Sequence, residues 1–252
     1  MQLKYTLFSS ISMLAFSSLS VFSQTEKMNV LFLMADDMRP ELGCYGVKEV
    51  KTPNIDRFAA SGLLFQNAYC NIPVSGASRA SLLTGVYSAY ASKDCPTAIP
   101  ISRWFTSHGY YTISNGKVFH HLSDHANSWS EPPYRKHPDG YDVYWAEYNK
   151  WELWMNEASA RTINPKTMRG PFCEWAEVPD TAYDDGKLAL KAIADLKRLK
   201  EQGKPFFMAC GFWKPHLPFN APKKYWDLYD REKIPVANNR FRPAGLPDEV
   251  KN

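Results

Sequence analysis

The stretch NIPVSGASRASLLTG, residues 71–85, places a serine four residues before an arginine in a run of small residues. These two residues are Ser75 and Arg79. A serine in such a loop most often forms a turn or caps a helix. The chain also carries paired carboxylates and two Lys/His pairs, which are residue types that bind anions and transfer protons. Ser75 is therefore a candidate for catalytic chemistry, and the turn or cap is the alternative.

Two adjacent acids, Asp36 and Asp37, follow the apolar run MNVLFLMA. An isolated pair of this kind more often caps the next element. Neighbouring side chains on a regular strand point to opposite faces, so both acids can reach one site only if the strand ends at Asp36. If it does, two hard oxygen ligands suit calcium or magnesium rather than a metal that prefers sulfur.

Lysine and histidine recur together at two other places. Lys117 and His120 follow Gly116, and Lys214 and His216 lie in the segment KPHLPF. A lone histidine is more often a surface or hydrogen-bonding residue than a catalyst. This non-catalytic role remains the alternative for both His120 and His216. The prolines that flank His216 stiffen its backbone directly after an apolar run, which favours a functional role there.

The elements that must position these residues alternate between strands and helices. Apolar runs predict strands at 28–37, 63–70, within 110–120 and at 204–213. Helices are predicted at 52–62, from 78 onward, at 99–109 and at 181–204, with glycines at several ends. This alternation is typical of an α/β fold with a mostly parallel sheet. Ligands bind beyond the carboxyl ends of such strands, where the three polar groups lie.

The length, net charge, N-terminal segment and cysteines of the chain exclude several classes of protein. The chain has 252 residues and a formal net charge of +4, too weak and dispersed to indicate nucleic acid binding. Residues 1–23 have the pattern of a cleaved secretory signal, too short and serine-rich to span a membrane. No cysteine follows the expected cut, so we expect a periplasmic or secreted protein without a lipid anchor. The five cysteines form no CxxC pair, which argues against a zinc site.

An irregular segment between residues 128 and 175 is rich in aromatic residues, above all in GYDVYWAEYNKWELWMNE. Core packing or a lid is the favoured interpretation, and stacking on a sugar is the alternative. We assign no site residue to it.

These segments together resemble a type I sulfatase, most closely the iduronate-2-sulfatase group. The family signature is Cys or Ser, any residue, Pro or Ala, any residue and Arg, followed by Leu-Thr-Gly. It stands here as SGASR at 75–79 and LTG at 83–85. The blocks NVLFLMADDMRPELGCYG, TPNIDRFAASGLLFQNAY, GKVFH and FWKPHLPF also match, over most of residues 28–235. The resemblance implies an alkaline-phosphatase-like α/β/α sandwich with a mostly parallel central sheet.

The resemblance also implies a reaction, the hydrolysis of sulfate esters of sugars. Its expected substrates are 2-O-sulfated uronic acid units of glycosaminoglycans or related polysaccharides. In this family the signature residue, here Ser75, is oxidised after translation to formylglycine, whose hydrate attacks the ester. A serine at this position implies a radical-type sulfatase-maturing enzyme as partner.

Roles for the other candidates follow from the same resemblance. Asp36, Asp37 and the residue at position 75 would bind Ca²⁺. Arg79 would stabilise the formylglycine, Lys117 would hold a sulfate oxygen, His120 would assist proton transfer and His216 would act as general acid at the leaving oxygen. The helix expected after Ser78 would add its N-terminal N–H groups to the anion site.

The sequence departs from the family pattern at several points. Serine stands at position 75, Ala77 replaces the commoner proline, and Val86 replaces a frequent basic residue. The later Ser-Asp-His-Gly-like segment, which supplies further calcium ligands in the family, does not occur before Asn252. We therefore expect residues 28–252 to be an incomplete N-terminal catalytic domain. A related phosphatase that uses Ser75 directly, and a fragment without turnover, remain alternatives.

Overall fold

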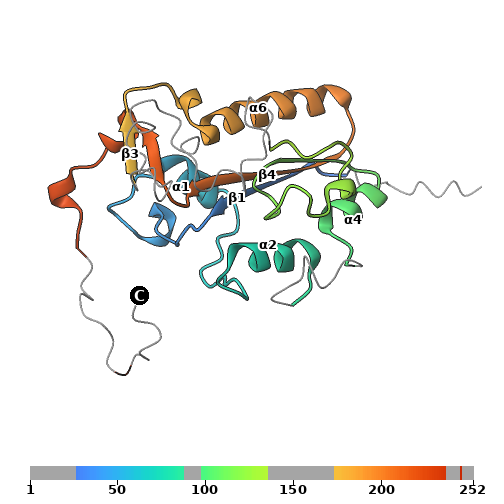
Figure 1. Cartoon of the computed structure of the whole chain (residues 1–252), viewed down its shortest axis with the longest axis horizontal. Coiled ribbons are helices and arrows are strands. Elements are labelled where there is room, and N and C mark those ends of the chain that lie inside the picture. Colours follow the sequence, from blue (N-terminus) through green and yellow to red (C-terminus); the bar gives the residue numbers. More distant parts are fainter. Residues whose placement is uncertain (1–26, 88–97, 136–172, 237–244, 246–252) are drawn as a thin grey trace, which may run out of the picture.

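A three-stranded parallel sheet forms the centre of the computed structural model, which describes residues 27–87, 98–135, 173–236 and 245. Strand β4 (Phe206–Pro215) lies between β1 (Val30–Asp36) and β2 (Tyr111–Gly116), in the order β1-β4-β2. All three strands run the same way, so their carboxyl ends meet at one edge (Figure 1). The predicted parallel α/β arrangement is confirmed.

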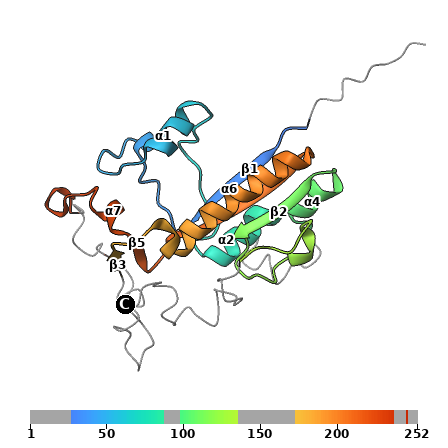
Figure 2. The same ribbon diagram turned by 90° about the horizontal axis from the view of Figure 1, so that it is seen from above.

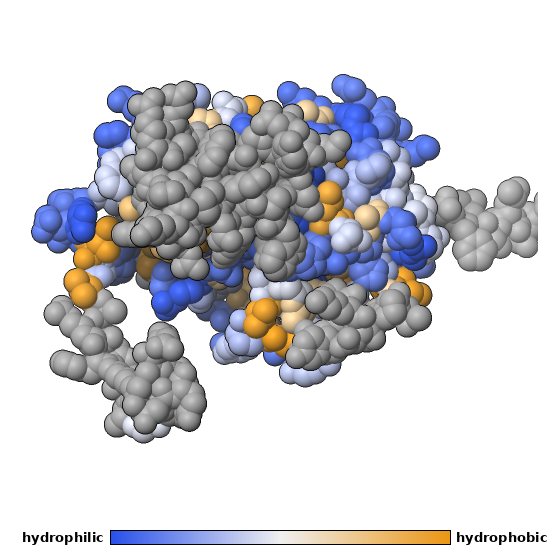
Figure 3. All heavy atoms as spheres, viewed as in Figure 1, coloured by the Kyte–Doolittle hydropathy of each residue, from blue (hydrophilic) through white to orange (hydrophobic). Residues whose placement is uncertain are grey.

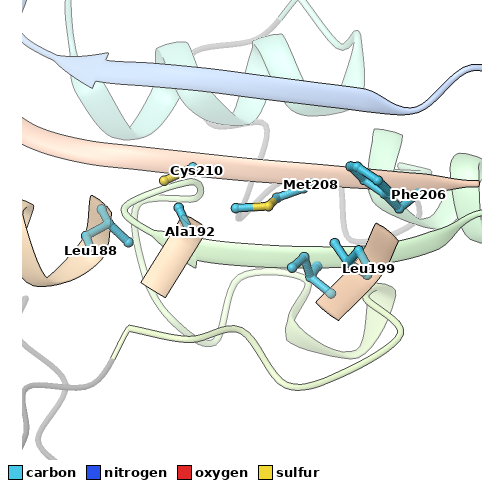
Figure 4. Packing of buried hydrophobic residues seen from close by; sticks show 7 residues of the cluster. Leu188, Ala192, Leu199, Phe206, Met208 and Cys210 are labelled. Carbon is cyan, nitrogen blue, oxygen red and sulfur yellow. The ribbon is translucent and has the colours of Figure 1, made fainter. Parts of the chain in front are cut away.

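Helices cover both faces of this sheet. Helix α6 (Asp184–Gln202) lies on one face, and α2 (Ser75–Thr84) and α4 (Ile101–Ser107) lie on the other (Figures 1 and 2). The alternation of side chains along β4 supplies both layers of core. Phe206, Met208 and Cys210 pack with Leu188 and Leu199, two of them from α6 and three from β4 (Figure 4).

The opposite face of β4 completes the sandwich. Phe207 and Ala209 pack there with Leu83 of α2 and with Trp129. The ring of Phe105 on α4 stacks on Phe207 with 4.5 Å between ring centroids. The sheet is thus buried on both sides along β4, which explains the continuous apolar run in its sequence.

The ends of the helices follow their sequence signals. Helix α6 has Asp184 and Asp185 in its first turn, where acids favour the helix dipole, and Gly203 closes it in the left-handed conformation at φ 64°. Helix α1 (Pro53–Ala60) begins with Pro53, whose missing N–H costs nothing at that position.

A smaller pair of strands lies beyond the carboxyl edge of the main sheet. Strand β3 (Cys173–Ala176) pairs in parallel with β5 (Phe219–Pro222), which leads into helix α7 (Lys223–Trp226). Short 3-10 turns lie at Gly43–Tyr45, Ala126–Ser128, Asp180–Ala182 and Arg231–Lys233. None of the described helices is long and apolar enough to cross a membrane.

Two predictions about elements were wrong. Residues 63–70 form no strand: Leu63 is 82% exposed, and no described strand pairs with this segment. A strand forms only where a neighbouring strand pairs with its backbone N–H and C=O groups. An apolar run of residues does not show whether such a neighbour exists. Helix α2 begins at Ser75 rather than after Ser78, because the Ser78 N–H already bonds to the Val74 carbonyl at 2.8 Å.

Two of the sequence predictions, the secretory signal at 1–23 and most of the aromatic segment, lie outside the described residues. Cys95 lies outside them too. The other four cysteines, Cys44, Cys70, Cys173 and Cys210, are free thiols.

Candidate active site

The hydroxyl of Ser75 lies at the point where β1 ends and α2 begins. Its Oγ donates to Oδ1 of Asp36 at 2.8 Å and accepts from Nε of Arg79 at 3.0 Å. Ser75 and Arg79 are four residues apart on one helix, so their side chains share a face. The start of α2 at Ser75 therefore explains the spacing of the SGASR motif.

Asp36 is the centre of the charge arrangement. Its buried carboxylate accepts from Nη2 of Arg79 at 2.8 Å and from Nζ of Lys117, the first residue after β2. Burial alone would raise the pKa of Asp36, but the hydrogen bond from Lys117 and the charge of Arg79 outweigh it and lower the pKa to about 2. Asp36 is therefore ionised at any pH at which the protein would act.

Arg79 also fixes the segment that carries Lys117. Its Nη1 donates to the carbonyl of Lys117 and, at 3.0 Å, to that of Val118. One guanidinium thus joins the start of α2, the end of β1 and the chain after β2. Arginine suits this role because its donors are held in a rigid planar fork.

His120 lies against the first turn of α2. A Cβ at Gly76 would come within 3.2 Å of Cγ of His120, so the imidazole packs directly over that glycine. Burial, followed by the charge of Lys117, lowers the pKa of His120 to about 4. The imidazole is therefore neutral near pH 7 and able to accept a proton.

Asp37 and His216 form the exposed side of the cluster. Nε2 of His216 lies 3.6 Å from Oδ2 of Asp37, whose side chain is 56% exposed. Asp37 has a left-handed backbone with φ 56°, so the strand has ended at Asp36 as the sequence argument required. Nδ1 of His216 lies 2.7 Å from the carbonyl of Leu217.

The structure thus brings the predicted residues to one edge of the sheet. Asp36, Ser75, Arg79 and Lys117 are joined by direct hydrogen bonds. His120 adjoins them through Gly76, and His216 through Asp37. Two cations and a hydroxyl beside the ionised carboxylate of Asp36 can bind an anionic ester and attack it.

A sequence profile described as Sulfatase matches residues 28–244, most of the chain. The chain belongs to the sulfatase family. It is 36% identical over 255 residues to the protein named iduronate 2-sulfatase from Homo sapiens. That match takes in 91% of this chain and 42% of the human protein, so the chain spans less than half the length of this relative. The resemblance seen in the sequence is confirmed.

Solved structures share the fold. Ps i-CgsB in complex with k-i-k-neocarrahexaose matches with a TM-score of 0.57 and 24% identity, over 83% of this chain and 50% of that chain. The phosphonate monoester hydrolase of Agrobacterium radiobacter matches with a TM-score of 0.56 and 22% identity, over 83% of this chain and 45% of that chain. At such identities the likeness concerns the fold alone, and it confirms the α/β sandwich of the sulfatase and alkaline phosphatase type.

The oxygen donors of this cluster are of the type that binds a hard cation. They are the carboxylates of Asp36 and Asp37 and Oγ of Ser75, and Asp36 is ionised. Calcium takes about 6–8 oxygens, which is more than these residues supply. In the part of the chain that the structure describes, no group of three or more His, Cys, Asp or Glu side chains could hold a metal ion. The residues therefore fit part of a calcium site.

Sequence reasoning missed three residues beside the site. Arg135 donates to the carbonyl of His120 at 2.9 Å, and its guanidinium lies 4.9 Å from the ring centroid of Trp213. Asp185 accepts from the backbone at the end of β4. Trp213 could have been noticed as the last residue of an apolar run, directly before Lys214. Arg135 and Asp185 carry no local signal, because their partners are far away in the sequence.

Proposed function

We propose that this chain carries the catalytic centre of a sulfuric ester hydrolase that removes sulfate from sulfated sugars. The observation that carries the proposal is the position of Ser75 Oγ, 2.8 Å from Asp36 and 3.0 Å from Arg79 in a sulfatase-family chain. The proposed substrates are 2-O-sulfated uronic acid units of glycosaminoglycans or related polysaccharides. The 36% identity to a protein named iduronate 2-sulfatase supports this substrate class.

Position 75 would supply the nucleophile. Oxidation of Ser75 to formylglycine by a radical-type maturing enzyme would give a hydrated aldehyde, one hydroxyl of which attacks sulfur while the other later expels sulfate. Arg79 is in place to orient this side chain, because its Nε already donates to the oxygen at position 75. An unmodified serine would instead leave a stable sulfate ester on the protein.

Asp36, Asp37 and the oxygen at position 75 would hold Ca²⁺. The ion would withdraw negative charge from the ester. The ionised state of Asp36, with its pKa lowered to about 2, supports this assignment because calcium binds deprotonated carboxylates.

The remaining residues would bind the sulfate group and transfer protons. The buried ammonium of Lys117 would bind an oxygen of the sulfate ester, since it already lies in the site beside Asp36. His120, neutral near pH 7, would accept a proton from the hydroxyl at position 75. His216, on the exposed side of the cluster, would donate a proton to the leaving sugar oxygen.

The proposed location is the periplasm or the medium. The apolar, serine-rich pattern of residues 1–23 supports it, together with the need of a polysaccharide hydrolase to meet its substrate outside the cytoplasm.

Mass spectrometry of the peptide that contains Ser75 tests the proposal. The chain is produced with and without a radical-type maturing enzyme, and each sample is assayed with calcium and a sulfated uronic acid disaccharide. We expect the loss of two hydrogens at Ser75 and sulfate release in the matured sample alone. Ser75→Ala is the control and should be inactive in both. Activity with an intact Ser75 would remove the formylglycine mechanism and favour a phosphatase-like use of the serine, whereas a matured but inactive chain would favour a fragment without turnover.

A further inference from the structure

Asp185 makes an unusual contact for a residue in the first turn of a helix. Both of its carboxylate oxygens accept backbone N–H groups from β4, Oδ1 from Trp213 and Oδ2 from Lys214, each at 2.9 Å. A carboxylate that takes two backbone donors fixes both position and direction of that backbone, because charge-assisted hydrogen bonds are short and strong.

The two N–H groups belong to an irregularity in the sheet. Strands β1 and β4 pair regularly as far as Ala35 with Phe212, but Asp36 is opposite Pro215. Trp213 and Lys214 are therefore extra residues on β4, and the ladder with β2 has already ended at Gly211. Such bulges re-aim side chains at the ends of strands. Asp185 supplies the acceptors that this irregular backbone needs.

The backbone held by Asp185 carries His216. Nζ of Lys214 donates to the carbonyls of His216 at 3.2 Å and of Pro218 at 2.6 Å, and the His216 N–H donates to the Trp213 carbonyl at 3.0 Å. The turn that presents His216 to Asp37 is thus built on the two residues that Asp185 holds.

Trp213 connects the same backbone to the cations of the site. Nζ of Lys117 lies 5.1 Å from its ring centroid, and the guanidinium of Arg135 lies 4.9 Å from it. Cations at this distance are attracted to the face of an indole. A shift of Trp213 would therefore also change the surroundings of Lys117.

We propose that Asp185 is a positioning residue, which sets the end of β4 and through it the direction of His216 toward the leaving group. The effect on proton donation by His216 rests on the proposed function, whereas the placement of the β4 backbone does not.

Burial raises the pKa of Asp185, and the two backbone donors only limit the rise. The backbone N–H groups of Trp213 and Lys214 are thus the partners that offset the lost solvation of this carboxyl group.

Hydrogen exchange of single amides tests the structural part. In Asp185→Ala the amides of Trp213 and Lys214 should exchange about tenfold faster or more, because each loses a charged acceptor. Asp185→Asn, a milder change, keeps one acceptor oxygen and should release at least one of the two amides. Asp184→Asn is the matched control, since it removes the same charge from the same helical turn, and it should leave both amides unchanged. Equal rates in all three variants, or acceleration spread evenly over α6 and β4, would overturn the proposal.

A comparison of two esters tests the catalytic part in matured, calcium-loaded protein. A sugar sulfate needs a proton at its leaving oxygen, whereas 4-nitrophenyl sulfate does not. In Asp185→Asn the fall in kcat for the sugar sulfate should exceed that for the aryl ester by about tenfold, within the range of general acid catalysis. Equal losses would overturn the positioning of His216. If unaltered protein hydrolyses neither ester, the proposed function fails, and the exchange rates still decide the role of Asp185.

Discussion

Asp36 is a buried carboxylate whose charge is compensated by its hydrogen-bond partners. It accepts from the half-buried Ser75 and from the buried Arg79 and Lys117. Removing a buried charge from water is costly unless partners surround it, and two cations here more than compensate, since the pKa of Asp36 falls to about 2. The same pairing holds the nucleophile position, the arginine and the lysine together.

The lowered pKa of Asp36 makes the free energy of unfolding depend on pH. The pKa of Asp36 is about 2 in the folded chain against an ordinary 3.8. Because the folded pKa is the lower one, the stabilisation is complete above pH 3.8 and is lost as pH falls through about 2, by about 2 kcal/mol in all. Urea unfolding between pH 5 and pH 2, with a chelator present, would measure it.

Asp36→Asn provides the comparison. At pH 5 this variant should be less stable by about 3–5 kcal/mol, because Lys117 and Arg79 stay buried without their carboxylate. The gap between the two proteins should narrow as the pH falls. A gap that stays constant from pH 5 to pH 2 would mean that Asp36 does not titrate with a lowered pKa.

At the scale of elements, the sequence allowed the convergence of β1, β2 and β4 to be predicted. Each is an apolar run that ends in polar residues, and parallel strands bring such ends together. The strand expected at 63–70 failed because pairing depends on a neighbour that periodicity does not reveal. The start of α2 was misplaced by three residues, since helix ends are the least certain part of a pattern. Asp185 and Arg135 could not be found, because their roles depend on contacts between distant segments.

The approach of β4 to the chain after β2 depends on Gly211. A Cβ at this position would lie 1.8 Å from the carbonyl oxygen of Lys117, and the Lys117 N–H donates to the Gly211 carbonyl at 2.8 Å. The obstructing atoms belong to the backbone, so they cannot move aside as a side chain could.

Gly211→Ala should therefore destabilise the fold by about 2–3 kcal/mol or more and displace Lys117 from Asp36. Urea unfolding measures the first effect, and sulfate release by matured protein measures the second. Gly62→Ala is the control, because its nearest neighbour, the Phe58 carbonyl oxygen, would be 3.7 Å away. Equal stability of the two variants would show that β4 and the Lys117 segment are less closely packed than described.

For the whole molecule, the most informative feature is one face of β1 that the described helices leave partly exposed. Helix α6 packs on β4 and β2, while β1 exposes alternate residues on the same face. Leu33 on β1 is 57% exposed, and Ile193 on the flank of α6 is 49% exposed. Figure 3 shows apolar residues scattered among hydrophilic ones on one face of the molecule. Exposed apolar side chains on the face of a sheet favour contact with another apolar surface.

The edge of β1 adds to this surface, since among the described strands only β4 pairs with it. The outer edge of β2, in contrast, is lined by the segment around Tyr134, whose N–H donates to the Ser114 carbonyl at 2.8 Å. A strand edge with which no described strand pairs, beside the exposed Leu31 and Leu33, favours association with another polypeptide.

We therefore expect the 252-residue chain to bind a dye for apolar surface, such as ANS, and to associate as its concentration rises. The double variant Leu33→Gln and Ile193→Gln should reduce both effects, because it replaces exposed apolar side chains on β1 and α6 with polar ones. Leu82→Gln, on the exposed side of α2 in the opposite layer, changes an equally apolar residue and should leave both unchanged. Dye fluorescence and light scattering after size exclusion provide the measurements. If the double variant and the control behave alike, the apolar residues beside β1 are not the ones that drive association.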